Sequence, residues 1–465
     1  MDTSRRDFMK LMGAVSLGFV GLRSIAGSND LFAMAAEDLS AFGYGPLKAL
    51  DSILKLPAGF SYKIIGKKGD KMSDGLFLPG RADGMGAFTG SKGKVILIRN
   101  HENKADDLIE SPFGENYKLL KKIKKEKFFD YGFGKAPHLG GTSTSIYNEV
   151  TQKVESVFMS LLGTSRNCAG GMTPWGSWIT CEEHFLNTDE QNEDAHGYNF
   201  EVPATEKIKI KFPIPLRAMG KFNHEAVCVD PRTGIVYQTE DQHEGLIYRF
   251  IPKVKGKLHE GGKLQALAFV WKKSMDTRNW TDTETLKPGT KYAVKWIDLN
   301  NIDSNKDDLR LRGFEDGAAC FARGEGMWFG KGELYFACTN GGAKKYGQIF
   351  RYIPSLHEGT AKENEIEYYP RLELFAEPNN TELLKYADNL TVAPWGDVVF
   401  CEDNKNPRII GITAAGKFYE IAENIGYPSE FAGVCFSPSG KTLFVNIQEA
   451  GLTLAITGPW AKRKA

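Results

Sequence analysis

The sequence lacks several motifs that identify common classes of enzyme. It contains no Gly-x-Ser-x-Gly segment, no His-Glu-x-x-His segment and no P-loop, which argues against an α/β-hydrolase, a zincin and a P-loop NTPase. Its seven cysteines include no Cys-x-x-Cys pair and no regular spacing, so a disulfide framework is not expected. The formal net charge of the 465 residues is only +1, and we therefore expect no nucleic-acid partner.

The N-terminal segment has too short an apolar run to cross a membrane, but it matches an export signal. Residues 4–10 contain the two adjacent arginines and the lysine of the twin-arginine pattern. The apolar stretch that follows, 11–22, is shorter than the roughly 20 residues that a membrane span needs. Residues 33–35 offer a small-x-small cleavage site, and Ala26 offers an alternative one.

We therefore predict a twin-arginine signal peptide at residues 1–35 and a mature domain at 36–465 without a stable membrane span. The expected partner is the twin-arginine translocation machinery, and the expected location is the periplasm or the cell exterior. This pathway moves folded proteins, commonly with a cofactor in place, which indicates a group loaded in the cytoplasm. An uncleaved anchor and a chance arginine pair are the alternatives.

One strand-turn phrase recurs six times along the rest of the chain. A glycine turn is followed by a short apolar run rich in Val, Ile, Tyr and Phe, which ends at an acid or an amide and is typical of a buried strand. Radial repetition of such strands predicts an all-β fold, a six-bladed β-propeller with irregular insertions between blades. The phrases lie at 93–102, 176–183, 234–241, 332–340, 396–403 and 440–448.

A second repeated element precedes each phrase and would pair with it as a hairpin. Five of these elements begin with a residue that can ligate a metal, and the sixth begins with Phe431-Ala432. Matching strand ends meet at one end of a central channel, so the sequence predicts a metal site there. The elements lie at 83–88, 168–174, 225–231, 325–329, 388–394 and 431–438.

The acids at these strand ends are too many to share a channel without cations, because like charges at close range raise one another's pKa. Carboxylate oxygens are hard donors that suit calcium or magnesium. For any single acid, a solvated strand end is an equal alternative. The candidates are Glu102, Glu182, Glu225, Glu240, Asp241, Glu325, Glu402 and Asp403.

Two residues near these acids suggest further chemistry. Cys168 stands where the neighbouring repeats place Glu225 and Glu325, and a thiolate among carboxylates suggests a transition metal such as iron. The alternative is a cysteine that only packs in the core. Arg323 lies two residues before Glu325, and its guanidinium fork suits phosphate or carboxylate oxygens.

Two histidines occur in identical Asn-His-Glu triplets. His101 and His224 each precede a candidate acid, and a neutral imidazole could ligate a metal or orient that acid. A histidine satisfied within the core is the alternative for each. The triplet alone does not separate these roles.

Several segments together resemble the PhoX-type alkaline phosphatases. The most specific reads Asn-Cys-Ala-Gly-Gly-Met-Thr-Pro-Trp-Gly from Asn167 onwards, and the resemblance covers about residues 83–451. The last phrase departs from the family, because Gln448-Glu449 stands where Gln-His is expected. The other segments that carry the resemblance are 222–227, 239–241, 248–252, 323–326, 388–390 and 440–448.

This resemblance implies a six-bladed propeller whose oxo-bridged cluster of iron and calcium ions hydrolyses phosphate monoesters. By motif, Cys168 resembles the thiolate that binds iron, Glu225 a carboxylate of the iron pair, and Glu325 a further metal ligand. Arg323 would hold the phosphoryl oxygens of the substrate. Analogy of position adds the remaining ligand candidates Glu102, Glu182, Glu240, Asp241, Asp388 and Asn389.

Two other functions compete with an exported phosphatase that acts on small phosphomonoesters. A calcium-dependent lactonase or phosphotriesterase could use the same carboxylates, but it would have no need of Cys168. A catalytically inactive, metal-stabilised binding scaffold would keep the acids and turn over no phosphoester. Iron together with calcium would distinguish the phosphatase from both.

Overall fold

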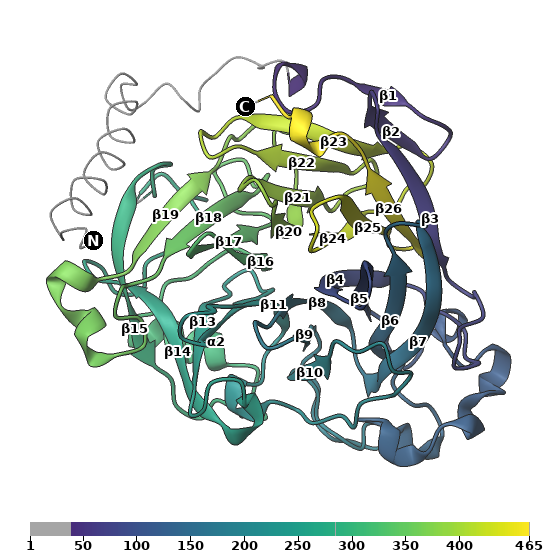
Figure 1. Cartoon of the computed structure of the whole chain (residues 1–465). Helices are drawn as coiled ribbons and strands as arrows, with labels where there is room; N and C mark the ends of the chain where they lie inside the picture. The colour runs from purple at the N-terminus through teal and green to yellow at the C-terminus, as the bar shows by residue number, and fades with distance from the viewer. Residues whose placement is uncertain (1–38, 284, 465) are drawn as a thin grey trace, which may run out of the picture. The chain divides into compact units, whose positions relative to one another are not determined.

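The computed structural model of the chain describes residues 39–283 and 285–464, which belong to one compact unit. The predicted signal peptide at 1–35 lies outside the described residues. The unit is all-β, and its sheets surround a common centre like the blades of a propeller, which confirms the predicted class of fold (Figure 1). Within the described residues, the only α-helix is α2 (Leu309–Asp316), and no helix is long and apolar enough to span a membrane.

The strands of the described residues form five hydrogen-bonded sheets. One contains β4 (Ala82–Thr89), β5 (Lys94–His101), β6 (Gly140–Asn148) and β7 (Lys153–Thr164). The next contains β8 (Asn167–Met172), β9 (Ser177–Glu182) and β10 (Asn199–Pro203). A third contains β24 (Phe431–Phe436), β25 (Thr442–Ile447), β26 (Leu452–Thr457) and β3 (Ser61–Lys67).

The two remaining sheets are larger. One runs through β20 (Ala387–Val392), β21 (Val398–Glu402), β22 (Arg408–Ile412), β23 (Phe418–Asn424), β2 (Leu54–Pro57) and β1 (Leu47–Ala49). The other begins with β11 (His224–Val229), β12 (Val236–Glu240), β13 (Ile247–Pro252) and β14 (Gly262–Phe269). It continues through β15 (Lys291–Asp298), β19 (Arg371–Ala376), β18 (Gln348–Ile353), β17 (Glu333–Cys338) and β16 (Gly324–Gly330).

The inner strand of each antiparallel hairpin faces the centre. Strands β4, β8, β11, β16, β20 and β24 contact one another in this order, and β24 contacts β4 again (Figure 1). The largest sheet contributes two of these inner strands, β11 and β16, because β15 pairs with β14 on one side and with β19 on the other. The last sheet is completed by an early strand, since β3 pairs with β26.

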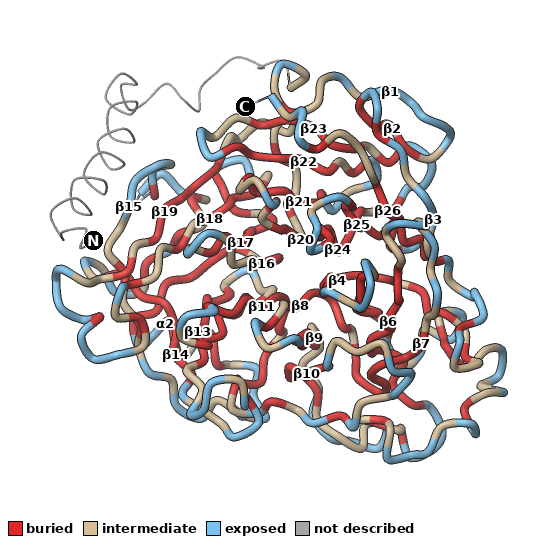
Figure 2. The backbone as a smooth tube through the Cα atoms, in the orientation of Figure 1, coloured by how far each residue is buried: buried red, intermediate tan, exposed pale blue. Residues whose placement is uncertain are grey.

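The inner strands are buried along most of their length, whereas exposed residues gather in the connections (Figure 2). Small residues allow these strands to approach closely at the centre. A Cβ on Gly326 would lie 2.5 Å from the backbone nitrogen of Leu390, and one on Gly84 would lie 2.6 Å from Cα of Ala169. The centre is therefore packed backbone against backbone just below the strand ends.

Each inner strand contains a β-bulge near one end. On β4, for example, Ala82 pairs with His101 and Met85 pairs with Arg99, so one extra residue is accommodated. Bulges aim side chains away from the regular alternation of a strand. The same kind of register shift occurs in the hairpins β8–β9, β11–β12, β16–β17, β20–β21 and β24–β25.

Short 3-10 helices lie outside the sheets, most of them in the connections between strands. They are η1 (Leu39–Ala41), η2 (Leu108–Glu110), η3 (Glu115–Tyr117), η4 (Leu120–Lys122), η5 (Lys125–Lys127) and η6 (Gly132–Gly134). Later in the chain are η7 (Arg217–Met219), η8 (Leu258–Glu260), η9 (Ala361–Asn364), η10 (Ile366–Tyr368) and η11 (Trp460–Lys462).

Candidate metal centre

A cavity of about 100 Å³ lies where the bulged ends of the hairpins meet, and we call it the acidic pocket. Carboxyl groups outnumber every other kind of side chain on its wall. The lining residues are Asp83, Glu102, Arg166, Cys168, Glu183, Glu225, Asp241, Arg323, Glu325, Asp388, Asp403, Glu430 and Gln448.

The inner strands supply one half of this ring through their bulges. On each of the first five, the residue that follows the first paired residue points into the pocket. On β24 the same position holds Ala432, which offers no ligand. The five lining residues that come from inner strands are Asp83, Cys168, Glu225, Glu325 and Asp388.

The second strand of each hairpin supplies the other half, through the residue just beyond its last pair. On β17 that position holds Thr339, which does not line the pocket. On the others it is a polar or acidic residue of the pocket wall. These residues are Glu102, Glu183, Asp241, Asp403 and Gln448.

Because side chains alternate between the two faces of a strand, two consecutive acids lie on opposite sides of it. Successive side chains of a strand point to opposite faces, so only one acid of a consecutive pair can enter the pocket. Glu240 instead accepts hydrogen bonds from the Tyr248 hydroxyl at 2.6 Å and from the Leu246 amide at 3.2 Å. Burial raises the pKa of Glu240 to about 7.

The same separation holds for the acids at the ends of β9 and β21. Glu182 accepts from the amides of Ser165 and Gly197, both at 2.9 Å, and contacts His196 Nδ1 at 2.7 Å. Glu402 accepts from Arg408 Nε at 2.9 Å. Glu182 and Glu402 therefore stabilise loops behind the pocket instead of lining it.

Asn389 lies one residue beyond the pocket wall. It lines a smaller cavity of about 20 Å³ at the packed centre of the ring. Its Nδ2 donates to Asp388 Oδ1 at 2.9 Å, and its Oδ1 accepts from the Gly433 amide. Asn389 is therefore placed to orient Asp388 and to tie β20 to β24.

The structure thus brings together most, but not all, of the residues that the sequence singles out. The acidic pocket contains Cys168, Glu225, Glu325, Glu102, Asp241, Asp388, Asp403 and Arg323. It does not contain Glu182, Glu240, Glu402 or Asn389. Lining residues absent from the expected set are Asp83, Arg166, Glu183, Glu430 and Gln448.

Signals for some of these additional residues are present in the sequence. Asp83 opens a repeated element in the same way as Glu225, and Glu183 directly follows a candidate acid. Gln448 ends the last phrase, and its Nε2 donates to Asp83 Oδ2 at 2.8 Å and to Glu102 Oε2 at 3.1 Å. The departure from the expected Gln-His is at Glu449, which is one residue beyond this lining residue.

Three arginines occupy equivalent positions at the mouth of the pocket. Arg81, Arg166 and Arg323 each stand two residues before an inner-strand ligand candidate. Their φ values are 45°, 46° and 48°, in the left-handed region that non-glycine residues rarely adopt. This backbone turn carries each guanidinium back over the strand end.

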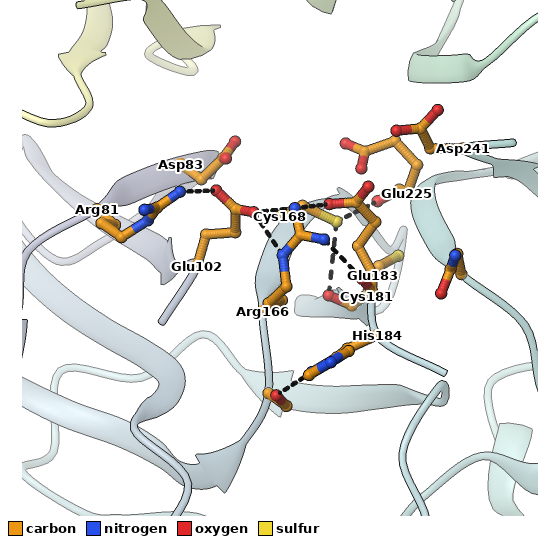
Figure 3. A network of polar contacts seen from close by, with 12 residues as sticks. Arg81, Asp83, Glu102, Arg166, Cys168, Cys181, Glu183, His184, Glu225 and Asp241 are labelled. Atoms are coloured by element: carbon orange, nitrogen blue, oxygen red, sulfur yellow. Dashed lines mark hydrogen bonds and ion pairs between the residues drawn. The ribbon is translucent and has the colours of Figure 1, made fainter. Parts of the chain in front are cut away.

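The guanidinium groups pair with carboxylates of the pocket. Arg323 Nε and Nη2 donate to the two oxygens of Asp241, both at 2.8 Å, and Nη2 also reaches Glu325 Oε1 at 3.0 Å. Arg166 bridges Glu102 and Glu183, as Figure 3 shows, with a distance of 2.6 Å from Nη2 to Glu183 Oε2.

Electrostatics at the pocket floor favour the uncharged forms of the acids. Burial, followed by repulsion from Glu183 and Asp388, holds the pKa of Glu225 well above its usual range. The same causes, burial first and neighbouring acids second, raise the pKa of Asp83, Glu183 and Glu325. Burial raises the pKa of Cys168 as well, and its Sγ donates to the carbonyl oxygen of His224 at 3.3 Å.

These residues fit bound cations. Two groups of ligand atoms, each gathered within 4.8 Å, share Glu225, namely Cys168–Glu183–Glu225 and Glu225–Glu325–Asp388. Asp83 Oδ1 is buried and has no hydrogen-bond partner among the described residues. Cations would favour the ionised acids and thiolate that ligation requires.

Neither histidine of the Asn-His-Glu triplets reaches the pocket. His101 Nδ1 contacts the Gly80 carbonyl at 2.9 Å, and Nε2 contacts Ser143 Oγ at 2.8 Å. His224 Nε2 contacts the Gly220 carbonyl at 3.1 Å. Burial lowers the pKa of both histidines to about 3, so both are neutral core residues next to a pocket acid.

Comparison with known proteins identifies a family whose model matches this chain. The sequence model of the family described as "Alkaline phosphatase PhoX" matches residues 42–451. No curated protein matches the chain.

Among solved structures, a gluconolactonase from Xanthomonas campestris is 12% identical with a TM-score of 0.40, covering 90% of this chain and 98% of that chain. A luciferin-regenerating enzyme is 12% identical with a TM-score of 0.40, covering 88% and 97%. The WD40 β-propeller domain of Doa1 is 9% identical with a TM-score of 0.36, covering 85% and 97%.

Proposed function

Because the chain belongs to the PhoX alkaline phosphatase family, we propose that its acidic pocket hydrolyses small phosphate monoesters with bound calcium and iron ions. One observation carries this proposal: a buried thiol, a set of carboxyl groups and the Arg323 guanidinium line the same small cavity. Carboxylates suit calcium, and a thiolate beside them suits iron. A hydrolase that used calcium alone would have no need of Cys168.

The two groups that share Glu225 divide the metal ligands by chemistry. Cys168, Glu183 and Glu225 would hold iron, because this group contains the sulfur. Glu225, Glu325 and Asp388 offer only oxygen and would hold calcium. When bound, the ions would supply Lewis acidity and neutralise the charge of the phosphate. Further oxygen donors for calcium are available from Asp83, Glu102, Asp241 and Asp403.

Arg323 is suited to bind the phosphoryl group. Burial would lower its pKa, but Glu325 and Asp241 raise it above the ordinary value, so the guanidinium stays charged. Two bonds to Asp241 fix the plane of the head group. Phosphoryl transfer depends mainly on positioning and on neutralising charge, and a fixed guanidinium provides both.

Arg81 and Arg166 extend this cationic rim. The side chains of Arg81, Arg166 and Arg323 are 35%, 28% and 32% exposed, whereas those of Glu102 and Glu325 are 6% and 8% exposed. An incoming phosphate would therefore meet guanidinium groups before it meets the buried carboxylates. This order of charges would attract a dianion to a pocket whose floor is acidic.

The proposal also includes the number of blades and the route of export. The closed order of contacts from β4 to β24 and the repeated strand ends support six blades, with β15 linking two of them. The twin-arginine pattern at residues 4–10 supports export through the twin-arginine pathway to the periplasm or beyond.

Elemental analysis of the purified protein, combined with hydrolysis of p-nitrophenyl phosphate, tests the proposed function. We expect iron and calcium in the same preparation and phosphate release that a chelator abolishes. Calcium without iron, together with hydrolysis of a lactone and not of the phosphate ester, would favour the lactonase alternative. Bound metal without hydrolysis of either a phosphoester or a lactone would leave only the binding scaffold.

A further inference from the structure

A second group of metal-ligating side chains lies behind the acidic pocket. It consists of Asp130, His138 and His196, whose ligand atoms are gathered within 4.8 Å of one another. Asp130 lies between η5 and η6, His138 between η6 and β6, and His196 between β9 and β10. All three side chains are at most 3% exposed.

One distance in this group matches that between two ligands of a tetrahedral metal, and a second is 0.6 Å longer. Asp130 Oδ2 lies 3.3 Å from His196 Nε2 and 3.9 Å from His138 Nε2. Two ligands of tetrahedral zinc, each about 2.0–2.1 Å from the ion, are roughly 3.3 Å apart. The imidazole rings of His138 and His196 lie side by side, with centroids 4.1 Å apart.

Surrounding contacts hold two of the ligands in place. Glu182 Oε1 lies 2.7 Å from His196 Nδ1, which leaves Nε2 facing Asp130. A carboxylate on the far nitrogen of a histidine is the usual support for a metal-binding imidazole. The Gly132 amide donates to Asp130 Oδ1 at 2.7 Å, so Oδ2 faces the two rings.

The charges of the buried side chains also favour binding of a cation. The side chains of Asp130 and Glu182 have no exposed surface, and between them lies a single imidazole that could carry one positive charge. One dication would balance both carboxylates and leave both imidazoles neutral.

We propose that Asp130, His138 and His196 bind a structural zinc ion that is separate from the metals of the acidic pocket. Two nitrogens and one carboxylate oxygen suit zinc, whereas calcium takes oxygen ligands. The fourth position would be taken by water or by Asn192 Oδ1, which lies 2.9 Å from His138 Nε2.

Such an ion would strengthen the smallest sheet. The sheet β8–β10 has three strands, and its β9 ends at Glu182, immediately before Glu183 of the acidic pocket. Zinc would tie the segment 130–138 to the β9–β10 connection.

Metal counting on the full-length protein tests this site. We expect roughly one zinc per chain in the wild type, as a single closed site requires, and almost none in His138→Gln. Iron and calcium should be unchanged in that variant. His259→Gln, a change at an exposed histidine, serves as the matched control and should retain the zinc. Cys168→Ala should also retain zinc even if it loses iron, which separates this test from that of the proposed function.

Zinc K-edge absorption of the wild-type protein gives a second measurement that needs no variant. We expect a nitrogen and oxygen coordination shell with two imidazoles and no sulfur. Absence of zinc after incubation with zinc salt, zinc retained in His138→Gln, or sulfur in the coordination shell would each overturn the site. Loss of iron instead of zinc in His138→Gln would overturn the zinc assignment.

Discussion

Arg323 and Asp241 form a two-point ion pair across the mouth of the acidic pocket. Nε and Nη2 of the guanidinium each lie 2.8 Å from one carboxylate oxygen. The two residues come from different hairpins, β16–β17 and β11–β12, so the pair joins neighbouring parts of the ring. A planar fork of this kind has a defined orientation, which a lysine cannot reproduce.

Replacement of Arg323 by lysine should therefore impair catalysis more than folding. We expect kcat/KM for p-nitrophenyl phosphate to fall by about 10²–10³-fold, the usual effect of losing one fixed donor to a transition state. Iron and calcium content and the melting temperature should change little. Arg312→Lys, in an ion pair on α2, is the matched control. Equal activity of both variants would remove Arg323 from the mechanism.

The consecutive acids Glu402 and Asp403 should respond differently to the same chemical change. Glu402→Gln weakens a buried ion pair with Arg408 and should lower the free energy of unfolding by about 2–4 kcal/mol. Asp403→Asn removes a charge from the pocket wall and should weaken calcium binding by on the order of tenfold, because calcium affinity follows ligand charge.

Denaturant titration and calcium titration of both variants measure these two effects. The reverse pattern would show that Glu402, rather than Asp403, faces the metals.

Cys168→Ala should lose iron while calcium remains. The carboxylates that would hold calcium are unchanged, and only the sulfur ligand is removed. Cys435→Ala, which truncates another buried cysteine, controls for the cavity that the change leaves. Iron at full occupancy in Cys168→Ala would refute the ligand assignment and return this residue to core packing.

Glu225→Gln should have opposite effects with and without metal. In the chelated protein the change removes a carboxyl group whose ionisation is opposed by burial and by repulsion from Glu183 and Asp388, so the free energy of unfolding should rise by on the order of 1–2 kcal/mol. In the loaded protein it removes the ligand that both groups share, so stability and metal content should fall.

Chemical denaturation with and without a chelator measures the sign of each effect. The same sign in both states would contradict the proposed sharing of Glu225.

Stability should decline at alkaline pH because of buried thiols such as Cys320. Burial raises the pKa of Cys320 to about 12, whereas an unfolded thiol titrates near about 8.5. Its contribution to stability is complete below about pH 8.5 and is lost as the pH rises towards 12, by roughly 1.4 kcal/mol per pH unit.

Between pH 8.5 and 10, Cys320→Ala should therefore lose about 2 kcal/mol less than the wild type. Urea titration at the two pH values gives this difference. Parallel declines in both proteins would show that Cys320 ionises normally in the folded state.

The repeated phrases of the sequence predict the inner hairpins well, because buried strands with glycine turns have a local signature. The phrase at 234–241 contains β12, and the element at 225–231 overlaps β11. The long sheet could not be foreseen in the same way. Strand β15 lies in an insertion without a repeat, and its pairing with β19 joins segments far apart in sequence.

The choice between adjacent acids could not be made from the sequence alone. At 182–183 and 240–241 the phrase ends in two acids, and a shift of one residue exchanges the faces on which they lie. The bulge on the partner strand, such as the register shift between His224 and Val227, determines which acid turns towards the pocket. Arg81 and Arg166 repeat the spacing of Arg323, a periodic signal that is visible once the position of the ligands is known.

The pairing of β3 with β26 sets the order in which the protein can mature. Asp83, near the start of the described chain, meets Gln448, near its end, through a hydrogen bond of 2.8 Å. A growing chain still on the ribosome has Asp83 but not yet Gln448 or β26, so the ring remains open beside Asp83. Closure of the ring must therefore follow the end of synthesis, and the last strands of the chain govern when the Asp83 carboxyl group obtains its hydrogen bond from Gln448.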